Sequence, residues 1–254
     1  MIQSVDRALD ILMCVSDNRG KPITISEIAE KTNLNQSTCC HIVETLTKRG
    51  FLNKVSRSSG YVLGIYAYSL TRYKNFHRDL IFACAPVLKW LQNKTGYTTL
   101  LANLIDGEKF VLRYFESSDN PLKDRGELYK GTLYDSATGR AMLSSMRQKE
   151  IRSIVEKVGL PSETQWEGID SFEKMMIELE KIAKDPIVKV AFHADGFYFC
   201  KFAAAFIGKK SERFAIGLEM KKKEMPQEDE IAAIEKYMLL AVKEVKRRIE
   251  FETI

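Results

Sequence analysis

The chain has 254 residues, which is longer than a typical single domain, and its 39 basic and 34 acidic residues leave a net charge of only +5. Two domains are the default expectation at this length, and so modest a charge does not by itself indicate nucleic-acid binding. No apolar run approaches the length of a membrane span, and the first residues do not resemble a signal peptide. We therefore expect a cytoplasmic protein with no membrane partner.

The five cysteines, at positions 14, 39, 40, 84 and 200, are odd in number and unevenly spaced. This pattern argues against a disulfide framework and favours reduced thiols. Cys39, Cys40 and His41 are consecutive on one predicted helix, so their side chains point in different directions and cannot bind one metal ion together. We predict no metal site and no cofactor.

Three helices are predicted at the start of the chain. The first spans Ser4–Asn18, and its predicted apolar face consists of Val5, Ala8, Leu9, Leu12 and Val15. Thr24 and Glu27 form a capping box, which starts the second helix. The third is capped by Asn35 and ended by Gly50. Two short helices of this kind, joined by a tight turn, are the pattern of a helix-turn-helix.

The turn itself is predicted at Asn33, because asparagine tolerates the positive φ that a sharp reversal requires. Beyond it, the third helix has a buried stripe and an opposite face of small hydrogen-bonding groups. Such a face suits the edges of bases in a DNA major groove, although a merely solvated face is the alternative. The candidate DNA-contacting residues on it are Gln36, Ser37, Thr38, Cys40, His41, Thr45 and Lys48.

A β-hairpin is predicted after this helix, because two short extended runs flank the turn-forming residues 56–60. The segment from Thr45 through Arg78 contains no acidic residue but several lysines and arginines. Such a segment can contact DNA phosphates, although it could also be only a solubilising surface. The candidate phosphate contacts are Arg49, Lys54, Arg57, Ser58 and Ser59.

The runs SVDRALDIL, SEIAEKTNLNQSTCCHIVETLTKRGFL and GYVLG, within residues 4–64, resemble the IclR family of bacterial transcriptional regulators. The resemblance implies an α+β protein with a winged helix-turn-helix domain over 1–64, a helical linker over 65–78, and a GAF-like antiparallel-sheet domain over 79–254. It implies that the last domain senses a small molecule, and that the protein forms a homodimer or homotetramer on operator DNA. The family often has an arginine where this chain has His41, so we expect an altered operator preference.

Several elements are predicted in the second half of the chain. A helix beginning near Asp79 should be interrupted or kinked at Pro86. Asp106 and Gly107 predict a tight hairpin turn, and residues 117–131 a polar loop. A later helix is predicted to be capped by Asp170. Two strands, 197–208 and 213–220, are followed by a final amphipathic helix over 227–251.

The resemblance also implies an effector site in this half. A helix start can bind a small carboxylate through its free amides, and a nearby strand in the family contributes a cysteine, whose position here is open between Cys200 and Lys201. We expect a small molecule with an anionic end, such as an organic acid. The alternative is that these positions are ordinary core. The candidate effector residues are Ala137, Thr138, Gly139, Cys200, Phe202, Gly217 and Glu219.

The sequence thus predicts a ligand-responsive, DNA-binding transcriptional regulator that is not an enzyme. One alternative is a winged-helix module that binds proteins without a ligand. A more remote one is a cysteine-dependent hydrolase built from His193, Asp195 and Cys200. Strand alternation predicts that residues 193 and 195 share a face and that 200 lies on the other, and we find no phosphate loop or nucleophile elbow.

Overall fold

The structure is a computed structural model that describes residues 2–18, 20–56, 60–70, 77–117, 129–208 and 211–251. The chain divides into two compact units, Met1–Arg78 (unit 1) and Asp79–Ile254 (unit 2). Each unit has its own hydrophobic core. Within the described ranges, every helix is too short or too polar to cross a lipid bilayer.

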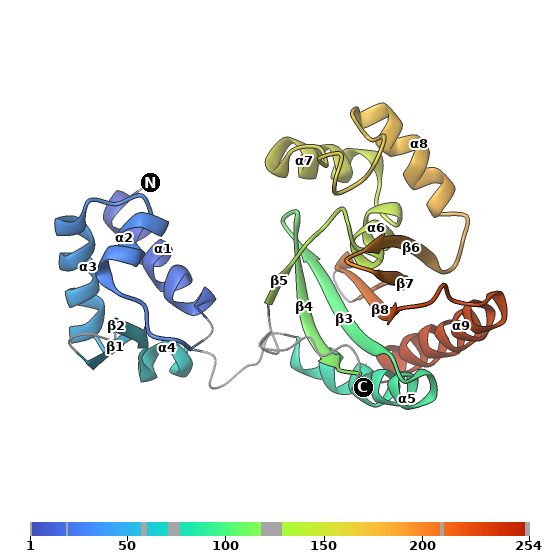
Figure 1. The fold of residues 1–254 in the computed structure, drawn as a ribbon, viewed down its shortest axis with the longest axis horizontal. Coiled ribbons are helices and arrows are strands. Elements are labelled where there is room, and N and C mark those ends of the chain that lie inside the picture. The colour runs from blue at the N-terminus through green and yellow to red at the C-terminus, as the bar shows by residue number, and fades with distance from the viewer. Residues whose placement is uncertain are drawn as a thin grey trace. The chain divides into compact units, whose positions relative to one another are not determined.

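Unit 1 is a helical bundle with a two-stranded antiparallel sheet (Figure 1). Its elements are α1 (Gln3–Asp17), α2 (Ile25–Lys31), α3 (Gln36–Lys48), β1 (Leu52–Ser56), β2 (Gly60–Leu63) and α4 (Ile65–Ser69). Ile11, Ile28 and Val43, one from each of the first three helices, are fully buried in one cluster. Because burying an aliphatic side chain stabilises a fold by ~1.5–3 kcal/mol, these contacts fix how the helices pack.

The predicted buried face of α1 is partly wrong. Ile11 and Val15 are buried, but Val5 and Leu9 are 54% and 56% exposed. The apolar side chains of α1 cover more of its surface than α2, α3 and β2 bury. Ile2 and Met13 are also exposed, on the same side of the helix as Val5 and Leu9. Helical spacing reveals such an arc but does not show which part of it is covered.

The predicted hairpin is present as β1 and β2, and it makes unit 1 a winged helix-turn-helix. Ile23, just before α2, pairs with Tyr61 of β2 through two backbone hydrogen bonds, with N–O distances of 2.8 and 3.0 Å. Gly60 has a φ of +92°, and its Cα lies so close to this pairing that an added Cβ would be 2.3 Å from the carbonyl oxygen of Ile23. Only glycine fits where the hairpin joins the bundle.

Unit 2 is built on one antiparallel six-stranded sheet with the strand order β5-β4-β3-β8-β7-β6. The strands are β3 (Thr98–Ile105), β4 (Glu108–Phe115), β5 (Tyr129–Gly131), β6 (Val188–Ala194), β7 (Phe197–Ile207) and β8 (Arg213–Lys222). The helices are α5 (Arg78–Thr95), α6 (Ala137–Ser144), α7 (Gln148–Val158), α8 (Phe172–Ile182) and α9 (Glu228–Phe251). Helices plus an antiparallel sheet confirm the predicted α+β class.

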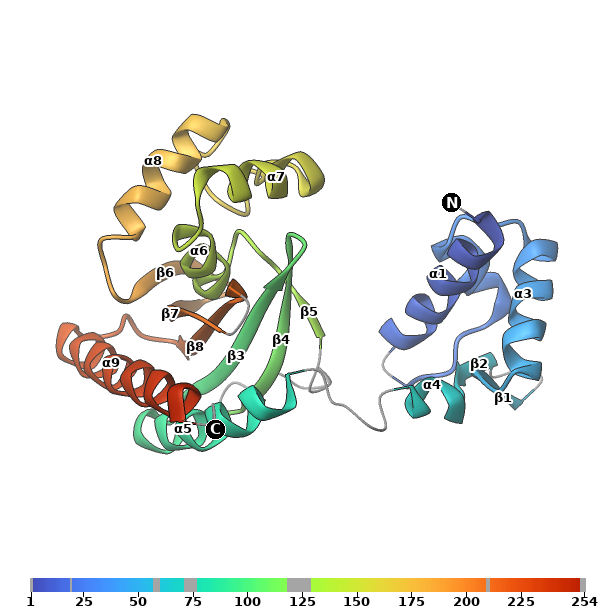
Figure 2. The same ribbon diagram turned by 180° about the vertical axis from the view of Figure 1, so that it is seen from behind.

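Helices cover both faces of this sheet (Figure 2). On one face, α5 and α9 pack against alternate residues of β7 and β8, including Phe202 and Leu218. On the other face, α6 packs against Ala203, with α7 and α8 outside it. Both sets of alternate residues in the central strands are therefore buried, as in a sheet enclosed from both sides.

Three local predictions can be compared directly with unit 2. The hairpin turn is confirmed, because Asp106 and Gly107 have φ values of +50° and +82°. An interruption or a kink was predicted at Pro86, and the interruption is wrong: α5 runs through Pro86, since buried residues on both sides hold the helix to the sheet. The predicted cap Asp170 is also wrong. Ser171 caps α8 by accepting from the Lys174 amide, while the Asp170 carboxylate pairs with the Lys174 ammonium. Most of the polar loop predicted over 117–131 lies outside the described residues.

Substituting alanine at Gly60 should destabilise unit 1 more than the same change at Gly20. Both glycines have positive φ, which costs an L-residue about 1–2 kcal/mol, but an added Cβ at Gly20 has no atom within 4 Å. Gly60→Ala should cost a further ~1–3 kcal/mol because backbone must move. Hydrogen exchange of α2 and α3 amides in the full chain measures both changes. Equal losses of protection in the two variants would contradict the steric argument.

Candidate nucleic-acid interface

The start of α2 is fixed by a reciprocal cap. The Thr24 hydroxyl accepts from the Glu27 amide at 3.3 Å, and the Glu27 carboxylate accepts from the Thr24 amide at 2.8 Å. The Thr24 hydroxyl also donates to that carboxylate, and together these hydrogen bonds lower the pKa of Glu27. The predicted capping box is confirmed.

The turn between α2 and α3 also matches the sequence prediction. Asn33 has a φ of +53°, and the Leu34 amide donates to the Ala29 carbonyl at 2.9 Å. Asn35 then caps α3 by accepting from the Thr38 amide at 2.8 Å. These contacts set the direction in which α3 leaves the turn.

The far end of α3 is closed by Gly50, whose φ is +70°. The Gly50 amide donates to the Thr47 carbonyl and the Phe51 amide to the Leu46 carbonyl, each at 2.9 Å. This arrangement satisfies carbonyls that the helix end leaves without partners. Both ends of α3 are thus held by local hydrogen bonds.

The helix presents one face to the core and one to solvent. Cys39 and Val43 are fully buried and form part of the core of unit 1. Of the predicted contact residues on α3 and its cap, Thr38 is half-buried and the others are exposed: Gln36, Ser37, Cys40, His41, Thr45, Lys48 and Arg49. The structure therefore gathers these side chains on an accessible helix face.

Two of the polar side chains already have a partner within unit 1. The Gln36 amide donates to the Ser26 hydroxyl of α2 at 3.3 Å, which holds it at the N-terminus of α3. The Thr45 hydroxyl donates to the His41 carbonyl at 2.9 Å. Thr45 thus keeps mainly its acceptor lone pairs and its methyl group for a ligand.

Glu44 is a surface residue of this face that the sequence reasoning missed. It is exposed, and it lies three residues after His41 and four before Lys48, so the three side chains share one side of α3. A carboxylate repels phosphates but can accept a hydrogen bond from the amino group of cytosine. The sequence analysis counted the basic residues after Thr45. Placing the acidic residues of α3 on a helical projection as well would have identified Glu44.

On the wing, Lys54 is exposed and its ammonium lies 5.7 Å from the centre of the Tyr61 ring. Arg57, Ser58 and Ser59 lie outside the described residues. The described part of the interface therefore combines the polar face of α3 with a cationic strand.

The predicted effector residues do not all come together. Cys200 and Phe202 lie on the face of the sheet that packs against α5 and α9. Gly217 pairs with Ala203, and an added Cβ on Gly217 would lie 2.7 Å from the Thr138 methyl, so Gly217 belongs to the α6 face. Glu219 is two residues along β8 and shares that face. The inclusion of Cys200 and Phe202 in one site with Thr138 is wrong.

Strand pairing shows which of the two open positions, Cys200 or Lys201, faces α6. Lys201 pairs with Glu219 and lies on the α6 face, where its ammonium donates to the Asp135 carbonyl at 3.4 Å. Lys201, rather than Cys200, therefore stands on the side of the sheet where the effector site was expected.

The start of α6 is tightly packed. Ser136 caps it by accepting from the Gly139 amide, and Ala137 and Thr138 are at most 4% exposed. An added Cβ on Gly139 would lie 1.8 Å from the Leu133 carbonyl oxygen. Lys109 of β4, only 5% exposed, places its ammonium 3.3 Å from the Thr138 hydroxyl. The sequence analysis missed Lys109, because only the fold brings β4 beside α6.

Arg140 of α6 holds the surrounding loops. It donates to the carbonyls of Tyr134 and Gln165 at 2.7 and 3.1 Å and stacks 4.2 Å from the centre of the Trp166 ring. Burial lowers the pKa of Arg140 to about 10, while Asp135 and Glu178 oppose that shift.

The face prediction for the hydrolase cluster is wrong. Asp195 and Gly196 form a tight turn with φ values of +52° and +74°, so Asp195 is not in a strand, and His193 pairs with Tyr198 on the same face as Cys200. Burial, then Glu230, raises the pKa of the Cys200 thiol, the reverse of what a nucleophilic cysteine needs. Among the described residues no three or more His, Cys, Asp or Glu side chains cluster to hold a metal ion.

Residues 4–56 match the model of the IclR helix-turn-helix domain. The acetate operon repressor of Salmonella typhimurium is 24% identical over 165 residues, and the transcriptional repressor IclR of Escherichia coli is 22% identical over the same length. Each alignment covers 64% of this chain but only 60% of the relative. Since 165 residues exceed unit 1, this similarity extends into unit 2.

Solved structures share the fold over nearly the whole chain. An IclR transcriptional regulator from Alicyclobacillus acidocaldarius has a TM-score of 0.74 at 18% identity and covers 98% of this chain and 99% of its own. An IclR homologue from Microbacterium hydrocarbonoxydans, complexed with 4-hydroxybenzoate, has a TM-score of 0.74 at 15% identity, covering 97% and 99%. Residues 4–56 thus form an IclR helix-turn-helix domain, and over the rest of its length the chain is similar to IclR regulators in sequence and in fold.

Proposed function

We propose that this protein is a transcriptional regulator, acting as a repressor, that binds duplex operator DNA through α3 and the wing and responds to a small molecule in unit 2. The observation that carries the proposal is the exposed polar face of α3, held at both ends, beside a cationic wing in an IclR helix-turn-helix domain. Two relatives are named as repressors, which supports the direction of control.

The residues divide into two roles. Gln36, Ser37 and Thr38 lie at the N-terminal end of α3, the part of a recognition helix that meets base edges. Lys48, Arg49 and Lys54 are cations at its other end and on the wing, where phosphate contacts give affinity without sequence choice. Arg57, Ser58 and Ser59 are proposed as further phosphate contacts, and Cys40, His41 and Thr45 as secondary groove contacts.

Lys54→Gln and Gln36→Ala should weaken DNA binding in different ways. A preferred site is first selected from random duplex DNA, and affinities are then measured from 50 to 300 mM salt. Lys54→Gln should weaken binding to all duplexes and reduce the slope of log affinity against log salt by about 1, because one phosphate contact is lost. Gln36→Ala should leave that slope unchanged and relax the preference at one base pair, by about 1–3 kcal/mol.

Lys149→Gln, which changes an exposed lysine of α7 in unit 2, is the matched control and should change neither quantity. If Lys54→Gln behaves like this control and Gln36→Ala keeps its sequence preference, unit 1 does not bind DNA in the proposed way.

Glu44→Gln should strengthen binding to non-specific duplex DNA several-fold, because it removes the negative charge from the exposed face of α3 while keeping the side chain's shape. The same variant should lose preference at any cytosine that the carboxylate reads. Competition between the selected site and a scrambled duplex measures both effects. Unchanged non-specific affinity would place Glu44 away from the DNA.

The effector is proposed to be an organic acid that also carries a hydrogen-bond donor. On the α6 face, Lys109 and Lys201 are cations, and Glu219 and the carboxylate of Asp135 are acceptors. An acid with a hydroxyl group matches both kinds of partner. The bound 4-hydroxybenzoate of a structural neighbour supports this chemistry. Ala137, Thr138, Gly139 and Gly217 would shape the site's wall.

A ligand of this class should raise the melting temperature of the full chain, and Lys201→Gln should reduce that rise by at least half. Binding to the native state at 100 times Kd adds about 2.7 kcal/mol of stability, which a thermal shift detects readily. The panel contains hydroxylated and unsubstituted aromatic and aliphatic acids. Lys181→Gln on α8 is the control. If the ligand raises the melting temperature of Lys201→Gln and Lys181→Gln equally, Lys201 does not contribute to the site.

We also propose a homodimer, from which a homotetramer can form. The exposed apolar residues of α1, namely Ile2, Val5, Leu9 and Met13, recur on one side of the helix. A partner subunit would remove this surface from water, and a two-fold dimer would present two recognition helices to a palindromic operator.

A further inference from the structure

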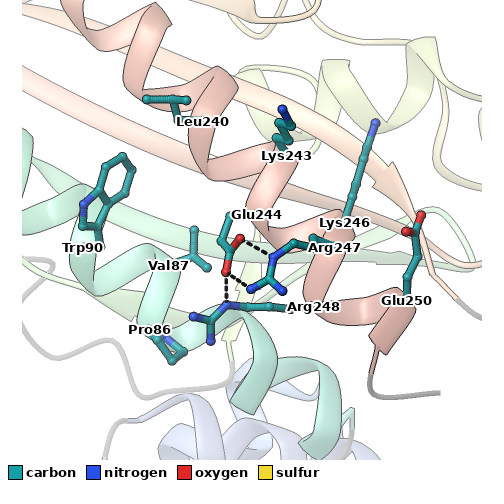
Figure 3. Close-up of a pocket in the computed structure, with 10 residues that line it drawn as sticks. All are labelled: Pro86, Val87, Trp90, Leu240, Lys243, Glu244, Lys246, Arg247, Arg248 and Glu250. Carbon is teal, nitrogen blue, oxygen red and sulfur yellow. Dashed lines mark hydrogen bonds and ion pairs between the residues drawn. The ribbon is translucent and has the colours of Figure 1, made fainter. Parts of the chain in front are cut away.

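Unit 2 has an open groove between α5 and α9, on the outer side of these helices (Figure 3). Its volume is about 740 Å³, which is within the range of small-molecule sites. Because α5 and α9 cover one face of the sheet and α6 the other, the groove is separated from the α6 face by the sheet itself.

One end of the groove is apolar. Val87 and Trp90 of α5 face Leu240 of α9, and Leu240 is 48% exposed although it is a large aliphatic residue (Figure 3). Trp90 is held by an edge-on contact with Tyr237, with 6.0 Å between the ring centres. This end offers a fixed aromatic wall and an aliphatic side chain to an apolar ligand.

The other end is cationic and organised by Glu244. Its carboxylate accepts from Arg247 and from the Arg248 Nε, each at 2.7 Å. The Arg247 bonds, then that of Arg248, lower the pKa of Glu244 to about 2, so the carboxylate stays ionised at neutral pH. The Arg248 guanidinium reaches from α9 toward Pro86 and Val87 (Figure 3). Its position is therefore set before any ligand arrives.

The lining residues carry an excess of positive charge. Four are basic and two are acidic, which leaves a net charge of +2: Lys243, Lys246, Arg247 and Arg248 against Glu244 and Glu250. Lys243 and Lys246 have no ion-pair partner within the described part of the chain. Desolvating these cations without a counter-charge is unfavourable, so an anion is the complementary occupant.

A second copy of the chain does not suit this groove. In a two-fold dimer the same surface patch meets itself, so two linings that each carry a net charge of +2 would face each other. The occupant must instead bring an apolar body for Trp90 and Leu240 and a negative end for Arg248.

We propose that the α5–α9 groove is a binding site for an amphipathic organic anion, whose carboxylate contacts Arg248 and whose hydrocarbon part lies on Val87, Trp90 and Leu240. This site is separate from the proposed effector site and does not depend on DNA binding. It gives unit 2 two anion sites on opposite faces of one sheet.

The test is calorimetric titration of the full chain with octanoate and with octanamide, which has the same chain length but no charge. Octanoate should bind saturably with one site per chain in the Lys201→Gln background, where the proposed effector site is impaired. Octanamide should bind about tenfold or more weakly, because it lacks the charge that pairs with Arg248. Trp90 fluorescence in Trp166→Phe should report the same Kd.

Two matched variants localise the binding. Leu240→Asp places a negative charge in the groove and should lower the affinity for octanoate by about tenfold or more. Leu239→Asp is the control, because Leu239 is equally exposed on the same helix but does not line the groove. Both positions are on the surface, so folding should survive, and circular dichroism checks that it does.

The proposal is overturned if octanoate and octanamide bind equally, if neither binds at millimolar concentration, or if Leu239→Asp weakens octanoate as much as Leu240→Asp. It is also overturned if light scattering shows an association of chains that Leu240→Asp disrupts and Leu239→Asp does not, because a second copy would then cover the groove.

Discussion

Alternation of side chains across the sheet of unit 2 is the constraint on which its chemistry depends. Helices enclose both faces, so neighbouring residues of β7 face different surroundings. Cys200 faces the apolar core under α5 and α9, whereas Lys201 faces α6. A shift of one residue in the pairing of β7 with β8 would exchange these two environments. The separation of the proposed effector site from the α5–α9 groove follows from the same alternation.

In unit 1 the periodicity of the α-helix has the same effect, because it places one side of α3 in the core and the opposite side in solvent. Cys39 and Val43 hold α3 against the core, so the opposite side of the helix is left to solvent. The caps at Asn35 and Gly50 add rigidity without using the side chains of that opposite side. A helix fixed by its ends and its buried stripe can present Gln36, Ser37 and Thr38 in one orientation, which base readout requires.

Local features of this fold are predictable from the sequence because a few neighbouring residues determine them. The capping box at Thr24, the left-handed Asn33 and the Asp106-Gly107 turn are of this kind. The second Asp-Gly turn, at 195–196, carries the same signal, and overlooking it led to the wrong faces for His193 and Cys200. The roles of Lys109 and Arg140 could not be predicted, because their partners come from distant segments that only the packed sheet brings together.

The charge on α3 determines which of the proposed DNA contacts supply non-specific affinity and which supply sequence preference. Glu44 stands between His41 and Lys48 on the exposed side, so the middle of the helix has little net attraction for phosphates. Cations at the end of α3 and on the wing, including Lys48, Arg49 and Lys54, must then supply most of the non-specific affinity. Since those groups lie away from the N-terminal end of α3, affinity and sequence choice depend on different residues. Changes at residues 36–38 can therefore alter the operator without altering the affinity for DNA in general.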